Sequence, residues 1–82
     1  MPTLLQRITL LSAGDPERLQ AWRAARRFAL TSHEQQVVHV EGHERRILPP
    51  GGLAATAAYS DEELIAFLDF LVLVQQSYAS FV

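Results

Sequence analysis

Residues 61–81 constrain this chain most, because they read as one helix whose apolar residues cover almost the whole circumference. Apolar residues recur at alternating spacings of three and four, the heptad spacing of a helix that packs against another helix. This seam consists of Leu64, Phe67, Leu71, Val74, Tyr78 and Phe81. Further apolar residues point elsewhere, and only Glu62, Asp69 and Gln76 form a polar line. A helix that is apolar nearly all round must be surrounded by other protein.

A chain of 82 residues offers little material to surround such a helix. A domain of this size buries roughly 60–65% of its unfolded surface, so its stability is marginal without further stabilisation. The sequence contains no cysteine, which excludes disulfides and cysteine-ligated metal clusters. We therefore expect a homo-oligomer, most simply a dimer, whose interface consists of the six seam residues of the C-terminal helix.

The charges are divided between the two halves of the chain. All seven basic residues are arginines, and every one lies at or before Arg46. Residues 47–82 carry only acidic charges. The net charge of −2 and the isoelectric point of about 5.8 argue against a strongly basic nucleic-acid module. Neither a secretory signal nor an apolar run long enough for a membrane span is evident, so we expect a cytoplasmic protein without membrane association.

The first half of the chain reads as two helices and a hairpin. Residues 3–13 fit one face of a helix that ends at Gly14, and a strand of nine residues also fits. Asp15 as an N-cap and Pro16 at the first helical position predict a second helix, from Pro16 to about Leu30. The valine-rich segment 35–40, a turn at 41–42 and the segment 43–48 predict a β-hairpin. The competing interpretation is a short helix capped by Ser32 that continues to Glu41.

A break at residues 49–52, Pro-Pro-Gly-Gly, joins the hairpin to the C-terminal part. Residues 53–58 are small and apolar, as in a helical turn that lies on the core. Ser60 and Glu63 then have the spacing of a capping box at the start of the last helix. The whole chain, residues 1–82, is thus predicted to form a single small α+β domain: helix, helix, β-hairpin and long C-terminal helix. The alternative is a mostly α fold.

Catalytic and ligand-binding motifs are scarce. The sequence lacks a nucleophile elbow, a phosphate-binding loop and a dinucleotide-binding fingerprint. His39 and His43 flank the hairpin turn, where their spacing does not by itself put both rings on one face, so we predict neither a metal nor a cofactor. We expect no enzyme. The one enzymatic alternative uses Pro2, exposed by removal of Met1, as the base of a tautomerase-like enzyme, and no second catalytic element accompanies it.

The arginines are the best candidates for a binding site. Three lie on the predicted second helix and two on the second hairpin strand: Arg23, Arg26, Arg27, Arg45 and Arg46. If the hairpin folds beside the helix, five guanidinium groups face one anionic partner. We expect a small non-enzymatic homodimeric protein of regulatory or adaptor type that binds another macromolecule, a protein in the first place. The alternative is a DNA- or RNA-binding regulator of winged-helix-like organisation, with the hairpin as its wing.

Overall fold

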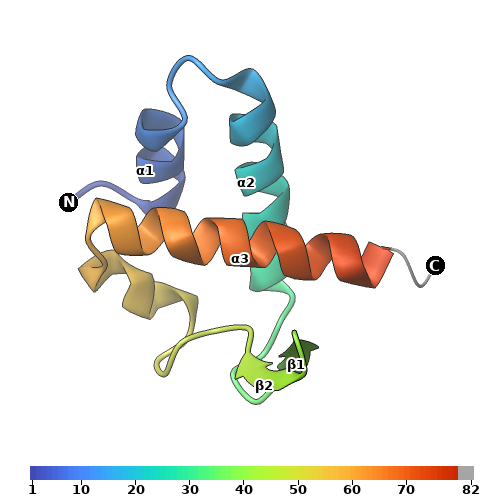
Figure 1. Cartoon of the computed structure of the whole chain (residues 1–82). Coiled ribbons are helices and arrows are strands. Elements are labelled where there is room, and N and C mark those ends of the chain that lie inside the picture. The colour runs from blue at the N-terminus through green and yellow to red at the C-terminus, as the bar shows by residue number, and fades with distance from the viewer. Residues whose placement is uncertain (80–82) are drawn as a thin grey trace.

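The computed structural model describes residues 1–79 of the chain and their side chains up to Ser77. The elements follow in the order α1 (Leu4–Leu11), α2 (Pro16–Leu30), β1 (Val37–Val40), β2 (His43–Arg46), the 3-10 helix η1 (Leu53–Ala58) and α3 (Asp61–Ala79). The predicted α+β order of two helices, a hairpin and a long C-terminal helix is confirmed. Helices α1 and α2 lie side by side and antiparallel, and α3 crosses both of them (Figure 1).

Residues 4–11 form a helix rather than a strand, because side chains cap its first turn. The Thr3 hydroxyl accepts a hydrogen bond from the backbone N–H of Gln6 (3.1 Å), and the Gln6 side-chain oxygen accepts one from the backbone N–H of Thr3 (2.8 Å). This reciprocal pair satisfies backbone donors that the start of a helix leaves unpaired. The same device opens α3, where Ser60 and Glu63 exchange hydrogen bonds of 2.9 and 3.2 Å, as the sequence predicts.

The segment after α2 is the predicted β-hairpin, and the competing interpretation of a helix that continues to Glu41 is wrong. Strand β1 pairs antiparallel with β2, with Val40 opposite His43 beside the turn. The turn residues Glu41 and Gly42 both have positive φ angles, 52° and 80°. Two-residue turns of this kind join antiparallel strands well, because their twist matches that of the strands. Glycine adopts such an angle without steric cost.

Arg7 fastens α1 to the segment that leads into α3. Its guanidinium group donates to the backbone carbonyl oxygens of Thr56 (3.4 Å) and Tyr59 (2.9 Å), and it pairs with the Asp61 carboxylate at 2.9 Å. The Arg7 side chain is only 14% exposed, whereas that of Asp61 is 69% exposed. The sheltered hydrogen bonds to the two carbonyl oxygens therefore stabilise this junction more than the exposed ion pair does.

The core lies where α3 crosses the two N-terminal helices. Its buried apolar residues are Ile8, Trp22, Ala25, Ala29, Ile47, Leu48, Leu64, Leu68, Leu71 and Val74. One polar contact crosses this region: the indole N–H of Trp22 donates to the Asp69 carboxylate over 3.0 Å. Asp69, which the sequence places in a polar line facing water, thus also holds α3 against α2.

The chain by itself buries three of the six seam residues of α3, Leu64, Leu71 and Val74, so these three do not need a second copy to cover them. Leu64, Leu68 and Leu71 are 0% exposed and Val74 is 2% exposed within the single chain. Up to Ser77, the stripe of α3 that stays exposed consists of small and polar residues apart from Leu73, which is 50% exposed. The buried seam residues Leu64, Leu71 and Val74 are therefore not available to a second copy.

Candidate functional site

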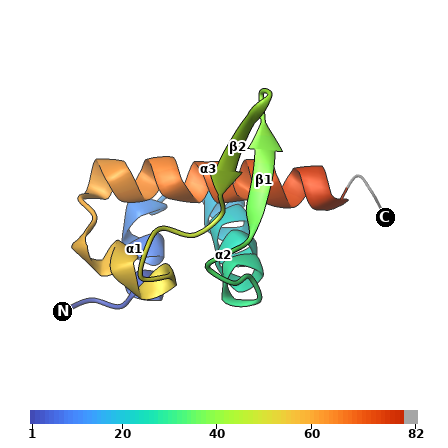
Figure 2. The same cartoon turned by 90° about the horizontal axis from the view of Figure 1, so that it is seen from below.

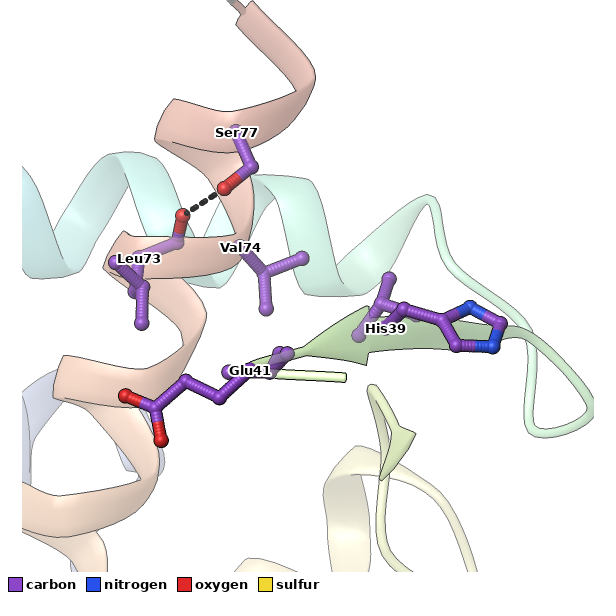
Figure 3. Close-up of a pocket in the computed structure, with 7 residues that line it drawn as sticks. His39, Glu41, Leu73, Val74 and Ser77 are labelled. Atoms are coloured by element: carbon purple, nitrogen blue, oxygen red, sulfur yellow. Dashed lines mark hydrogen bonds between the residues drawn. The ribbon is translucent and has the colours of Figure 1, made fainter. Parts of the chain in front are cut away.

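An open groove with a volume of about 300 Å³ lies between β1 and the C-terminal half of α3; we refer to it as the β1 groove (Figure 3). It is lined by Val38, His39, Val40, Glu41, Leu73, Val74 and Ser77. The Ser77 hydroxyl donates to the backbone carbonyl of Leu73 (3.1 Å), so it is satisfied within α3. The ring of His39 points away from α3, which leaves a largely apolar groove (Figure 3).

The two outer edges of the hairpin differ in charge. Strand β2 reads His-Glu-Arg-Arg, whereas β1 reads Val-Val-His-Val. The sheet of the described residues contains only these two strands. Charged side chains on an edge strand discourage pairing with a further strand. The edge of β1 lacks this protection, and it borders the β1 groove. Figure 2 shows the hairpin passing across α3, with its turn projecting beyond the helix.

The two hairpin arginines point to opposite faces of the hairpin, because successive residues of a strand alternate. The Arg45 guanidinium lies over the Phe70 ring of α3, 4.2 Å from its centroid, in a cation–π contact. Arg46 donates to the backbone carbonyl of Glu34 over 3.0 Å. Both side chains therefore hold the hairpin in place, and they do not face one partner together.

A second exposed surface lies on α2, opposite its buried face. Arg23, Arg27 and Leu30 are exposed there, Leu30 by 57%, and their spacings of four and three place them on one helix face. We refer to these three residues as the α2 face. Among the described residues the single ion pair is that of Arg7 with Asp61, so neither arginine of the α2 face has an acidic partner.

The predicted surface of five arginines is therefore divided. Arg23 and Arg27 share the α2 face, and Arg26 lies on the flank of the helix with its side chain partly buried. Arg45 and Arg46 are held by Phe70 and by a backbone carbonyl. The sequence pattern identifies the cationic helix correctly. It does not reveal Leu30, whose exposure depends on how far the neighbouring elements extend.

Three of the six residues predicted as an oligomer interface lie in the core of the single chain, namely Leu64, Leu71 and Val74. Phe67 is partly buried and meets the Tyr59 ring edge-on, at a centroid distance of 5.9 Å and an interplanar angle of 85°. The side chain of Tyr78 and the residue Phe81 lie outside the part of the chain that the structure describes. Among the described side chains of α3, the exposed large apolar residue is Leu73, which the heptad count leaves off the seam.

Other candidates for chemistry have structural explanations. His39 and His43 belong to adjacent pairs of the hairpin, so their side chains point to opposite faces. Within the described residues, no three His, Cys, Asp or Glu side chains gather in a way that holds a metal ion. The pKa of Glu63 is lowered because the backbone N–H and the hydroxyl of Ser60 hydrogen-bond with it at the start of α3. No described helix is long and apolar enough to cross a membrane.

Comparison with protein-family models, with curated proteins and with solved structures finds no match for this chain. Its function therefore has to be inferred from its own surfaces. Two of them stand out: the β1 groove with the uncharged edge of β1, and the α2 face.

Proposed function

We propose that this chain is a small, non-enzymatic, homodimeric protein of the cytoplasm that binds another protein, as a regulator or adaptor does. The proposed contact is the α2 face. The observation that carries the proposal is the alignment of Arg23, Arg27 and Leu30, all exposed on one side of α2, with no ion pair to either arginine among the described residues.

The chemistry of the α2 face indicates an acidic partner with an apolar pocket. Two arginines one helical turn apart repel each other weakly, and carboxylates on a partner relieve this repulsion and accept paired hydrogen bonds. Leu30 continues the same face and is 57% exposed. Burying a fully exposed leucine side chain contributes about 1.5–3 kcal/mol, so Leu30 gains roughly half of this in an apolar protein pocket and no comparable amount on a phosphate backbone.

A DNA- or RNA-binding regulator is the second candidate, favoured by the third arginine, Arg26, at the border of the α2 face. The number of available cations weighs against it. Proteins that bind duplexes with strong salt dependence make about 6–10 phosphate contacts. The hairpin arginines and Arg7 are engaged elsewhere, and the Arg18 guanidinium lies over the Trp22 ring, 5.3 Å from its centroid. This leaves three arginines of α2: Arg23, Arg26 and Arg27. Three phosphate contacts give a log–log salt slope of only about −2.7.

Fluorescence anisotropy with two labelled probes tests the proposal. One probe is a glutamate-rich peptide that contains leucines, and the other is a mixed-sequence DNA duplex. The substitutions Arg23→Gln/Arg27→Gln remove the cations, and Leu30→Ser removes the apolar contact. A control, Thr9→Glu/Leu10→Glu on α1, lowers the net charge by the same amount at exposed positions of another helix.

We expect the peptide to bind, and both the arginine and the leucine variants to weaken it by roughly tenfold, with the control unchanged. Binding of the duplex that depends on the arginines and not on Leu30, and exceeds that of the peptide, replaces this proposal with the nucleic-acid candidate. If neither probe binds at low salt, or if the arginine variant and the control behave alike, the α2 face is not a binding site.

A further inference from the structure

We infer that the homodimer forms by antiparallel pairing of β1 with β1 of a second copy, which lies along the β1 groove. This inference rests on the homodimeric part of the proposed function and names its interface. The two hairpins then make one continuous sheet in the order β2, β1, β1 of the second copy, β2 of the second copy. Three observations lead to it, the backbone geometry of β1, the charge of the two edges and the groove, and the register of the pairing follows from them.

The backbone of β1 has polar groups that point away from β2. Residues that flank a two-residue turn form a hydrogen-bonded pair, and bonded pairs then alternate with non-bonded ones along the hairpin. The hydrogen bond from the Ile47 N–H to the Gln36 carbonyl (3.3 Å) fits this alternation. The N–H and C=O groups of Val37 and His39 therefore point to the open side of β1, where they are available to another strand.

The charge of the two edges selects a second copy as the occupant. The edge of β1 carries no acidic residue and no arginine, whereas that of β2 carries Glu44, Arg45 and Arg46. When two copies pair through β1, the resulting sheet ends in the charged strand β2 on both sides. Charged edges resist further pairing, so the assembly closes as a two-fold dimer. A foreign strand would not supply such a protected edge by itself.

The β1 groove provides the space and the apolar surface that an added strand needs. Val38 faces α3 and packs against the core, and Leu73 borders the same groove with half of its side chain exposed. A two-fold axis perpendicular to the sheet keeps the α3-facing side of both hairpins on the same side. The added strand therefore brings valine side chains toward Leu73, where they are removed from water.

The register follows from satisfying every outward backbone group of β1. With Val37 opposite His39 of the partner subunit, and His39 opposite the partner's Val37, the N–H and C=O groups at these positions all meet a partner. Val38 then meets the partner's Val38 at the two-fold axis. A register moved toward the turn pairs Val37 with the partner's Glu41, and the φ of 52° at this residue is not that of an extended strand.

Proline substitutions on the two edges test this pairing, because proline lacks an N–H. His39→Pro removes an outward donor from β1. Glu44, directly opposite His39 in the hairpin, has its N–H on the outer side of β2, so Glu44→Pro is the matched control. A second pair leaves the backbone unchanged: Leu73→Asp beside the groove and Leu10→Asp on α1, at side chains that are 50% and 70% exposed.

Sedimentation equilibrium between about 1 and 200 µM measures the dimer, and circular dichroism verifies that each variant is folded. We expect a dissociation constant in the micromolar range for the unaltered chain. His39→Pro and Leu73→Asp should raise it by roughly tenfold or more, and the two controls should leave it within about twofold. Hydrogen exchange at the Val37 and His39 amides should slow as the protein concentration rises.

The possible contrary results have different consequences. A chain that stays monomeric throughout this range overturns both the inference and the homodimeric part of the proposed function. A dimer that survives both His39→Pro and Leu73→Asp overturns the interface and leaves the homodimer standing. If the Val37 and His39 amides are protected in a monomer, or only after a foreign extended peptide is added, the edge has another occupant and the inference fails. Binding at the α2 face is measured separately, so its outcome does not depend on these results.

Discussion

Replacing Asp69 with alanine removes the hydrogen-bond acceptor of the single tryptophan in this protein. The indole N–H of Trp22 donates to the Asp69 carboxylate over 3.0 Å, and the Trp22 side chain is 1% exposed. Asp69 itself is exposed at the surface of α3. In the variant the indole stays in the core between α2 and α3, and its N–H loses the carboxylate.

We expect Asp69→Ala to lower the free energy of unfolding by about 1–2 kcal/mol. A hydrogen bond to a charged group contributes about 1.5–3 kcal/mol to stability. The loss falls toward the lower end because the carboxylate is exposed, so water can occupy the vacated position and accept the bond. Asp69→Asn keeps a side-chain oxygen of similar size in reach of the indole, and should lower the free energy by less than about half as much.

A double-mutant cycle isolates this contact. The cycle consists of the unaltered chain, Asp69→Ala, Trp22→Phe and the double variant, in which no indole N–H is left without an acceptor. Urea unfolding followed by far-ultraviolet circular dichroism suits all four proteins, because the phenylalanine variants lack the tryptophan fluorophore. We expect a coupling energy of about 1 kcal/mol. Losses that add to within about 0.3 kcal/mol refute the assigned role of Asp69 in holding α3 to α2.

Two further predictions concern the start of α3. Arg7→Met should lower the free energy of unfolding by about 2–3 kcal/mol, because two sheltered carbonyl oxygens lose their donor, whereas Asp61→Asn should lower it by less than about 0.5 kcal/mol. Equal losses in urea unfolding contradict this ranking. Ser60→Ala should raise the pKa of Glu63 part of the way back toward 4.5, because the hydroxyl bond is lost and the backbone N–H of residue 60 remains. In the unaltered chain, the lowered pKa of Glu63 adds stability at pH values above the pKa of this residue in the unfolded chain. This stability is lost as the pH falls through the pKa in the folded chain. The Ser60→Ala variant should therefore lose less stability over that acidic range. An unchanged carboxyl titration of Glu63 by NMR shows that the hydroxyl does not act as described.

The helix boundaries depend on residues that are close in sequence, and the sequence predicts them well. The capping box of Ser60 with Glu63 and the proline after Asp15 place the starts of α3 and α2 correctly. For α1, helix and strand both fit the apolar spacing. Thr3 and Gln6 form a capping box there too, and this local signal distinguishes the helix from the strand.

The exposed surfaces depend on contacts between residues far apart in sequence. The alternation along β2 separates Arg45 from Arg46, but only the position of α3 places one of them on Phe70. Leu30 and Leu73 belong to regular helical patterns. Those patterns do not predict the exposure of either side chain, because it depends on which other elements of the chain pack nearby. The uncharged edge of β1 is visible in the sequence, whereas its position beside an open groove is not.

The sequence predicts the starts of α2 and α3 and shows that the last helix is apolar over most of its circumference, whereas for residues 3–13 it leaves helix and strand open. These features are predictable because helix capping and amphipathic spacing depend on residues that are close in sequence. What covers α3 is visible only in the folded chain. The chain supplies α1, α2 and the segment around Ile47 and Leu48, and buries Leu64, Leu71 and Val74 without a second copy. A local sequence pattern shows that one face of a helix is apolar. Which part of the protein packs against that face depends on contacts between residues far apart in sequence.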